Sequence, residues 1–117
     1  MLDIELVKVE HKENEQLVFR VLTDCNLWPY LIFDVLYDDN GVVSNSLRHS
    51  FVFPNYNVNS GDYIVLRTNR GQNESFTNRV KTKTHIFYWG FDDGTVLWRG
   101  GNKALIVKAS EYKYIGL

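Results

Sequence analysis

The stretch 84–91, with the sequence THIFYWGF, decides the fold class. In an extended chain, successive side chains point to opposite faces, so His85, Phe87 and Trp89 share one face. Ile86 falls on the other face, and the apolar residues show no repeat near 3.6. One face has to fill a core, because large aromatic side chains inside such a run are mostly buried. The stretch therefore predicts a β-strand.

The same two-residue period recurs on both sides of this stretch. It predicts further strands at 4–9, 17–21, 30–37, 47–53, 63–68, 96–99, 103–108 and 112–115. The face on which apolar residues fall switches between Leu6 and Val7, which indicates a β-bulge. Pro54 should end the run before it, because proline cannot donate to a sheet.

Turn signals lie between the runs. Asn, Asp and Gly cluster at 38–41, 59–62 and 92–94, and Gly100 and Gly101 read as a hairpin turn. No capping box precedes an amphipathic stripe, so no helix is predicted, and 69–83 is expected to be one long loop. We expect an all-β chain, an immunoglobulin-like two-sheet β-sandwich of about 7–9 strands that forms one domain over residues 1–117.

Composition excludes several classes of protein. The chain has 117 residues, of which 44% are hydrophobic, and a formal net charge of −1, which excludes disorder. Cys25 is the one cysteine, so a disulfide framework is excluded and a buried, reduced thiol is expected. No run is apolar enough to predict a membrane span. The opening residues lack a signal-peptide pattern, which predicts a cytoplasmic protein, or an extracellular one if the chain is a fragment of a longer secreted protein.

The charge is uneven along the chain. The first 40 residues are acidic, whereas the segment 67–83 is basic against Glu74 alone. Its candidate anion-binding residues are Arg67, Arg70, Arg79, Lys81 and Lys83. The favoured interpretation is a solvated loop that offsets the acidic residues, and the alternative is a site for nucleic acid or another polyanion.

Motifs for catalysis and metal binding are missing from the sequence. It has no Gly-x-Ser-x-Gly, no Cys-x-x-Cys, no His-x-x-x-His and no Walker spacing. Asp34 interrupts an apolar run, where a buried carboxylate would need a hydrogen-bonding partner. We interpret Asp34 as a strand residue on a solvent-exposed face, and the alternative is a perturbed acid in a cleft. We therefore predict no catalytic, cofactor-binding or metal-binding residue and a protein that is not an enzyme.

The aromatic residues are the remaining candidates for binding. Trp28, Trp89 and Trp98 are expected to be structural, because aromatic side chains in strand runs usually pack in the core. An exposed set would instead mark a binding surface, and rings of this kind stack on sugars or on bases. Carbohydrate binding is therefore a further alternative.

Two stretches resemble the lamin tail domain, a small immunoglobulin-like sandwich. Residues 48–68 show an aromatic–proline strand end followed by Gly61-Asp62 and an apolar strand. Residues 87–107 show Trp89-Gly90, a valine–tryptophan pair at 96 and 98, a glycine turn and an Ala-x-Ile strand. The chain departs from the family in the extra residue at 97 and in Asn102-Lys103, and the first 40 residues show no match.

What this resemblance implies is an interaction or structural module without catalytic residues of its own. The expected partner is a protein, with no cofactor and no membrane. The oligomeric state is open, and the strand expected at 112–115 is a candidate for pairing with another subunit.

Overall fold

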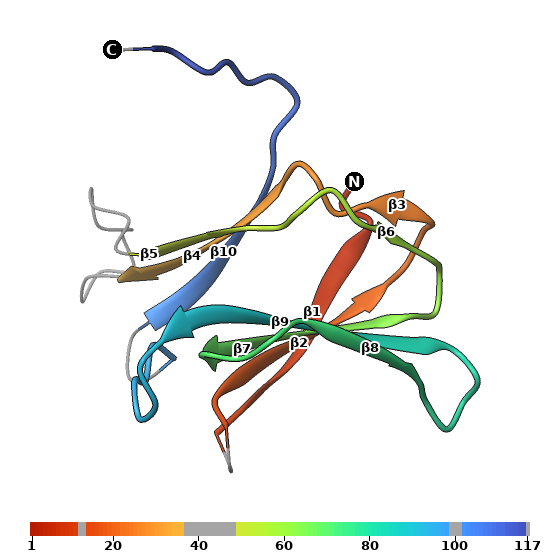
Figure 1. Cartoon of the computed structure of the whole chain (residues 1–117). Coiled ribbons are helices and arrows are strands. Elements are labelled where there is room, and N and C mark those ends of the chain that lie inside the picture. The colour runs from red at the N-terminus through yellow and green to blue at the C-terminus, as the bar shows by residue number, and fades with distance from the viewer. Residues whose placement is uncertain (12–13, 37–48, 99–101, 117) are drawn as a thin grey trace.

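The chain folds into strands arranged as two main sheets and a short ribbon (Figure 1). The computed structural model describes residues 1–11, 14–36, 49–98 and 102–116. Within these ranges there are ten strands and no helix, so the predicted all-β class is confirmed. The described part of the chain accordingly holds no helix long and apolar enough to cross a lipid bilayer.

The larger sheet has five strands in the order β1-β2-β7-β9-β8. Their bounds are β1 Ile4–Glu10, β2 Gln16–Val21, β7 Tyr63–Asn69, β8 Glu74–Thr77 and β9 Lys83–Phe91. All neighbours are antiparallel except β7 and β9, which run parallel. The expected bulge is present, because the β1–β2 register shifts between Leu6 and Lys8.

The smaller sheet has three strands in the order β10-β4-β5. Their bounds are β4 Tyr30–Leu36, β5 His49–Val52 and β10 Asn102–Lys108, all antiparallel. A two-residue ribbon pairs β3 Cys25–Asn26 with β6 Asn57–Val58. Cys25 is half-buried rather than fully buried.

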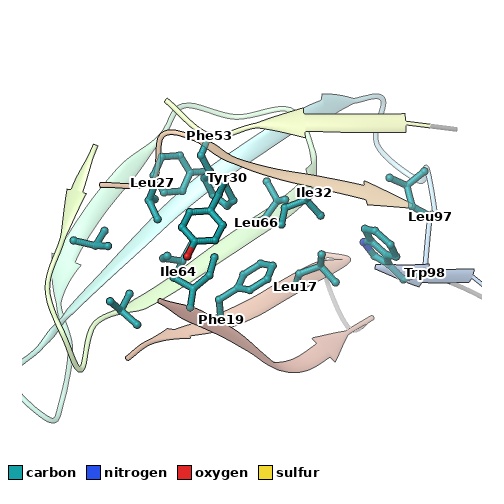
Figure 2. Packing of buried hydrophobic residues seen from close by; sticks show 14 residues of the cluster. Leu17, Phe19, Leu27, Tyr30, Ile32, Phe53, Ile64, Leu66, Leu97 and Trp98 are labelled. Atoms are coloured by element: carbon teal, nitrogen blue, oxygen red, sulfur yellow. The ribbon is translucent and has the colours of Figure 1, made fainter. Parts of the chain in front are cut away.

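The core lies between the two sheets (Figure 2). Side chains of the larger sheet, such as Phe19 and Leu66, meet side chains of the smaller sheet, such as Ile32. Tyr30 is fully buried at the start of β4 and donates its hydroxyl to Asp3 Oδ2 at 2.7 Å. Burial raises the pKa of Tyr30 to about 12. This packing is that of a β-sandwich.

The turns that the structure describes agree with the sequence. Gly61 has φ +92°, and Asp62 N donates to Asn59 O at 3.0 Å. Gly94 has φ +88°, a conformation that glycine adopts without steric cost. Strand β5 ends before Pro54, as expected. The turns predicted at 38–41 and at Gly100 and Gly101 lie outside the described residues.

Three predicted elements are wrong. Residues 69–83 are not one loop, because β8 lies within them and forms a hairpin with β9. Residues 96–98 are not a strand, because the buried carboxylate of Glu15 accepts hydrogen bonds from Leu97 N and Trp98 N at 2.8 and 3.1 Å. Residues 112–115 are not a strand either, because the strand that pairs with β10 begins at Tyr30, opposite Lys108.

Candidate functional site

The five basic residues of the 67–83 segment do not form one patch. Arg67 donates to Gln16 Oε1 and to the Tyr88 hydroxyl, each at 3.0 Å, in the middle of the larger sheet. The remaining four residues lie near one end or the other of β9. Since β7 and β9 are parallel, residue 67 is level with residue 88, about 17 Å along β9 from residue 83.

The other four basic residues lie at the two ends of β9. Arg70 lies near the end of β9 and pairs with Asp92 at 2.9 Å. Arg79 and Lys81 lie in the turn between β8 and β9, and Lys83 begins β9. All three of these are exposed. The basic residues thus form two separate groups. Arg67 and Arg70 make hydrogen bonds and an ion pair within the protein, and Arg79, Lys81 and Lys83 lie together at the other end of β9.

The three tryptophans occupy different environments. Trp98 is buried at 7% exposure and belongs to the core. Trp89 is half-buried and packs against the core, with ring centroids 5.8 Å from Phe51 and 6.0 Å from Trp98. Trp28 is also half-buried but lies outside the core cluster. Of the three, it is therefore the one whose ring does not pack in the core cluster.

Trp28 lies in an open groove of about 490 Å³. The described residues that line the groove are Trp28, Val52, Phe53, Pro54, Asn55, Tyr112 and Tyr114, none of which is charged. Trp28 Nε1 donates to the Tyr112 hydroxyl at 3.0 Å. The ring planes of Trp28 and Tyr112 stand at 88°, and those of Tyr112 and Tyr114 at 78°. We call these seven residues the aromatic groove.

Asn26 on β3 connects Trp28 and Asn55, which line two sides of the aromatic groove. Its side-chain oxygen accepts from Trp28 N at 2.9 Å, and its amide nitrogen donates to Asn55 Oδ1 at 2.6 Å and to Asn57 Oδ1 at 3.0 Å. The third wall follows β10, where Ala109 N donates to Pro29 O at 3.1 Å. The groove is thus built where the ribbon, the start of β4, the end of β5 and the 110–116 segment meet.

A buried hydrogen-bond chain links three titratable side chains elsewhere in the sandwich. Asp62 Oδ2 lies 2.9 Å from His85 Nε2, and His85 Nδ1 lies 2.7 Å from the Tyr56 hydroxyl. Burial by itself raises the pKa of Asp62, but hydrogen bonds from His85 and from the N–H groups of Lys83 and Asn59 outweigh it and lower the pKa below 3.8. The carboxylate therefore stays ionised, and these hydrogen bonds hold the 59–62 turn against β9.

Asp34 does not lie on a solvent-exposed face of the sheet. It is buried at 1% exposure and accepts from His49 N at 2.8 Å, with His49 Nδ1 3.0 Å from the same oxygen. The prediction of a solvent-exposed position is therefore wrong, and the carboxylate is hydrogen-bonded inside the sandwich, as a buried acid has to be. The two residues face each other across β4 and β5, so this pair joins the two strands. Within the described ranges, no three His, Cys, Asp or Glu side chains are grouped to hold a metal ion.

Comparison with protein-family models, with curated proteins and with solved structures finds no match for this chain. The resemblance to the lamin tail domain therefore stays a prediction. So does an immunoglobulin-like order of strands.

Sequence reasoning missed two walls of the aromatic groove. The sequence predicts a strand at 112–115, which includes Tyr112 and Tyr114, and it gives no role to Asn55. The signal available was Trp28 itself, because it stands between the predicted strands 17–21 and 30–37 rather than inside one of them. An aromatic residue in a connection is freer to face solvent than one in a central strand.

Proposed function

We propose that the chain is a non-enzymatic binding module whose partner is a protein, held at the aromatic groove. The observation that carries this proposal is the convergence of Trp28, Tyr112 and Tyr114 around an uncharged groove of about 490 Å³. Tryptophan and tyrosine are enriched among the residues that dominate binding energy in protein interfaces. Their large, rigid rings give much contact area for little loss of conformational entropy.

The walls of the groove favour an extended peptide segment as the part of the partner that binds. Val52, Phe53 and Pro54 form an apolar wall, and Val52 is 46% exposed. Val52 is also the last residue of β5, which is one of the two edge strands of the smaller sheet among the described residues. An extended segment can add backbone hydrogen bonds along such an edge while its side chains enter the adjacent groove.

Selection from a random peptide library displayed on phage tests this proposal. We expect enriched peptides rich in proline, aromatic or aliphatic residues, because these fit an uncharged groove lined by rings. Binding of a synthetic enriched peptide should fall at least about tenfold in the variant Tyr114→Ser, since anchoring rings contribute more than about 1.4 kcal/mol. Tyr114 is 81% exposed, so this change should leave the fold intact.

A matched control distinguishes binding at the aromatic groove from nonspecific binding to exposed aromatic rings. Phe76 is 50% exposed on β8 and does not line the groove, so Phe76→Ser removes an exposed ring elsewhere. Peptide affinity should be unchanged in this variant. A selection without enriched sequences, or equal loss of binding in both variants, contradicts the proposal.

Carbohydrate binding is the second candidate, supported by the same rings beside the amide group of Asn55. Sugars present apolar C–H faces that stack on such rings and hydroxyl groups that bond to amides. A glycan array probed with the wild-type chain and with Tyr114→Ser distinguishes the two candidates. Glycan binding that depends on Tyr114, together with a failed peptide selection, would replace the first candidate by the second.

A further inference from the structure

The stretch 112–115 within the 110–116 segment is predicted to be a strand, but it pairs with no strand of the described residues. Strand β10 pairs with β4 until Lys108 faces Tyr30, and the last bond runs from Ala109 N to Pro29 O. Figure 1 shows the chain leaving the sandwich beyond the end of β10. Three of its seven residues, Tyr112, Tyr114 and Ile115, are of types that favour strands.

The large side chains of this segment are among the most exposed apolar groups in the described chain. Tyr112 is 61% exposed, Tyr114 is 81% exposed and Ile115 is 76% exposed. A segment that exposes strand-forming side chains without a strand pairing can pair with another chain.

We propose that the partner of this segment is the same segment of a second copy of the chain, paired antiparallel about a two-fold axis. This inference rests on the proposed function, because Tyr112 and Tyr114 are walls of the aromatic groove, and it names a protein that binds there. A two-fold interface is self-complementary, so if residue i contacts residue j, then j contacts i.

The charges of the segment select one register. About a two-fold axis perpendicular to the strands' sheet, facing residues must lie on the same face, so their numbers differ by an even amount. A register centred on residue 111 places Glu111 opposite Glu111, and one centred on residue 113 places Lys113 opposite Lys113. The register centred on Tyr112 places Glu111 opposite Lys113 twice. Facing opposite charges stabilise a strand pair, and facing like charges destabilise it.

The same register also places the apolar side chains together. Tyr112 faces its own copy, Ala109 faces Ile115, and Tyr114 faces Ser110. Tyr114 shares a face with Tyr112, so the tyrosines of both copies lie on the side of the Trp28 rings. The charges and the contact between the two Tyr112 side chains thus favour the same arrangement.

Charge reversal tests this arrangement without disturbing the core, because Glu111 and Lys113 are both exposed. Sedimentation equilibrium should show a reversible dimer for the wild-type chain. Glu111→Lys and Lys113→Glu should each weaken dimerisation by about tenfold or more, since two attractive pairs become repulsive. A mixture of the two variants should form a heterodimer, and the double variant with the charges exchanged should dimerise like the wild type.

A control variant and the opposing results complete the design. Lys81→Glu reverses an exposed charge in the β8–β9 turn and should leave dimerisation unchanged. A wild-type chain that stays monomeric at its solubility limit, or a dimer that ignores the charge reversals, overturns the inference. If a monomeric wild-type chain still binds the selected peptides through Tyr114, the proposed function holds and the dimer is refuted. If the dimer responds to the charge reversals as expected while no peptide is selected, the second copy is the partner at the aromatic groove and peptides of other proteins are not.

Discussion

Glu15 should be among the most costly polar residues to replace in this chain. Its side chain is 5% exposed, and Oε1 accepts from the Thr68 hydroxyl at 2.7 Å and from Leu97 N at 2.8 Å. Oε2 accepts from Trp98 N at 3.1 Å. One carboxylate therefore satisfies two consecutive backbone N–H groups and fastens the segment that carries Trp98 to β2 and β7.

The magnitude follows from the number of donors that lose their acceptor. Glu15→Gln keeps one oxygen for Thr68 and Leu97 but turns an amide nitrogen towards Trp98 N, which leaves one donor unsatisfied. A lost hydrogen bond to a charged group costs about 1.5–3 kcal/mol, so we expect a loss of about 2 kcal/mol for Glu15→Gln. Glu15→Ala leaves three donors without an acceptor, and about 4 kcal/mol is expected. Both losses are large beside a total stability of about 5–15 kcal/mol.

Urea unfolding followed by tryptophan fluorescence measures these losses. Glu5→Gln on the exposed face of β1 is the matched control and should change the free energy of unfolding by less than about 0.5 kcal/mol. If Glu15→Gln is as stable as this control, Glu15 does not hold the 97–98 backbone, and the explanation for the missing strand at 96–98 is refuted.

Three further predictions concern single residues. Because folding lowers the pKa of Asp62, its carboxylate stabilises the protein above about pH 4, and this stabilisation is lost as the pH falls through the folded pKa. The difference in unfolding free energy between wild type and Asp62→Asn should therefore shrink on acid titration, and a constant difference contradicts this. Gly71→Ala should lower the melting temperature by several degrees, since a Cβ at this position would overlap the ring of Tyr88; an unchanged melting temperature contradicts it. Burial and the charge of Asp3 raise the pKa of the Cys25 thiol, so alkylation at about pH 8 should be slower than for free cysteine, and an equal rate contradicts this.

The fold class was predictable because its determinant is local. Alternation in 84–91 and in 63–68 requires no knowledge of distant residues, and both runs became central strands of the larger sheet. Turn chemistry is also local, and for that reason Gly61 and Gly94 take the positive φ values expected of them.

The incorrect predictions at 96–98 and 74–77 depend on residues outside each run. The valine–tryptophan pattern at 96–98 is strand-like, but Glu15, more than 80 positions earlier, takes its backbone donors. The run 74–77 forms a strand because β9 offers an edge, although all four of its residues are exposed and show no apolar face. Tertiary context overrides strand propensity in both directions.

The aromatic groove was predictable only in part. The presence of Trp28 outside a strand was visible, but its contact with Tyr112 spans 84 positions of sequence. Likewise, the basic residues of 67–83 are close in sequence, but the strands carry them to different ends of the sheet. Proximity in sequence and proximity in space therefore differ most where the candidate sites lie.

The chemical shifts of the three indole N–H groups test the central claim most directly. In a ¹H–¹⁵N spectrum, Trp28, Trp89 and Trp98 each give one indole signal, and the variant Tyr112→Phe assigns Trp28 because it removes that indole's acceptor. On titration with a selected peptide, the Trp28 signal should move while that of the buried Trp98 stays in place. Binding that leaves the Trp28 signal unmoved would contradict the placement of the binding surface at the aromatic groove.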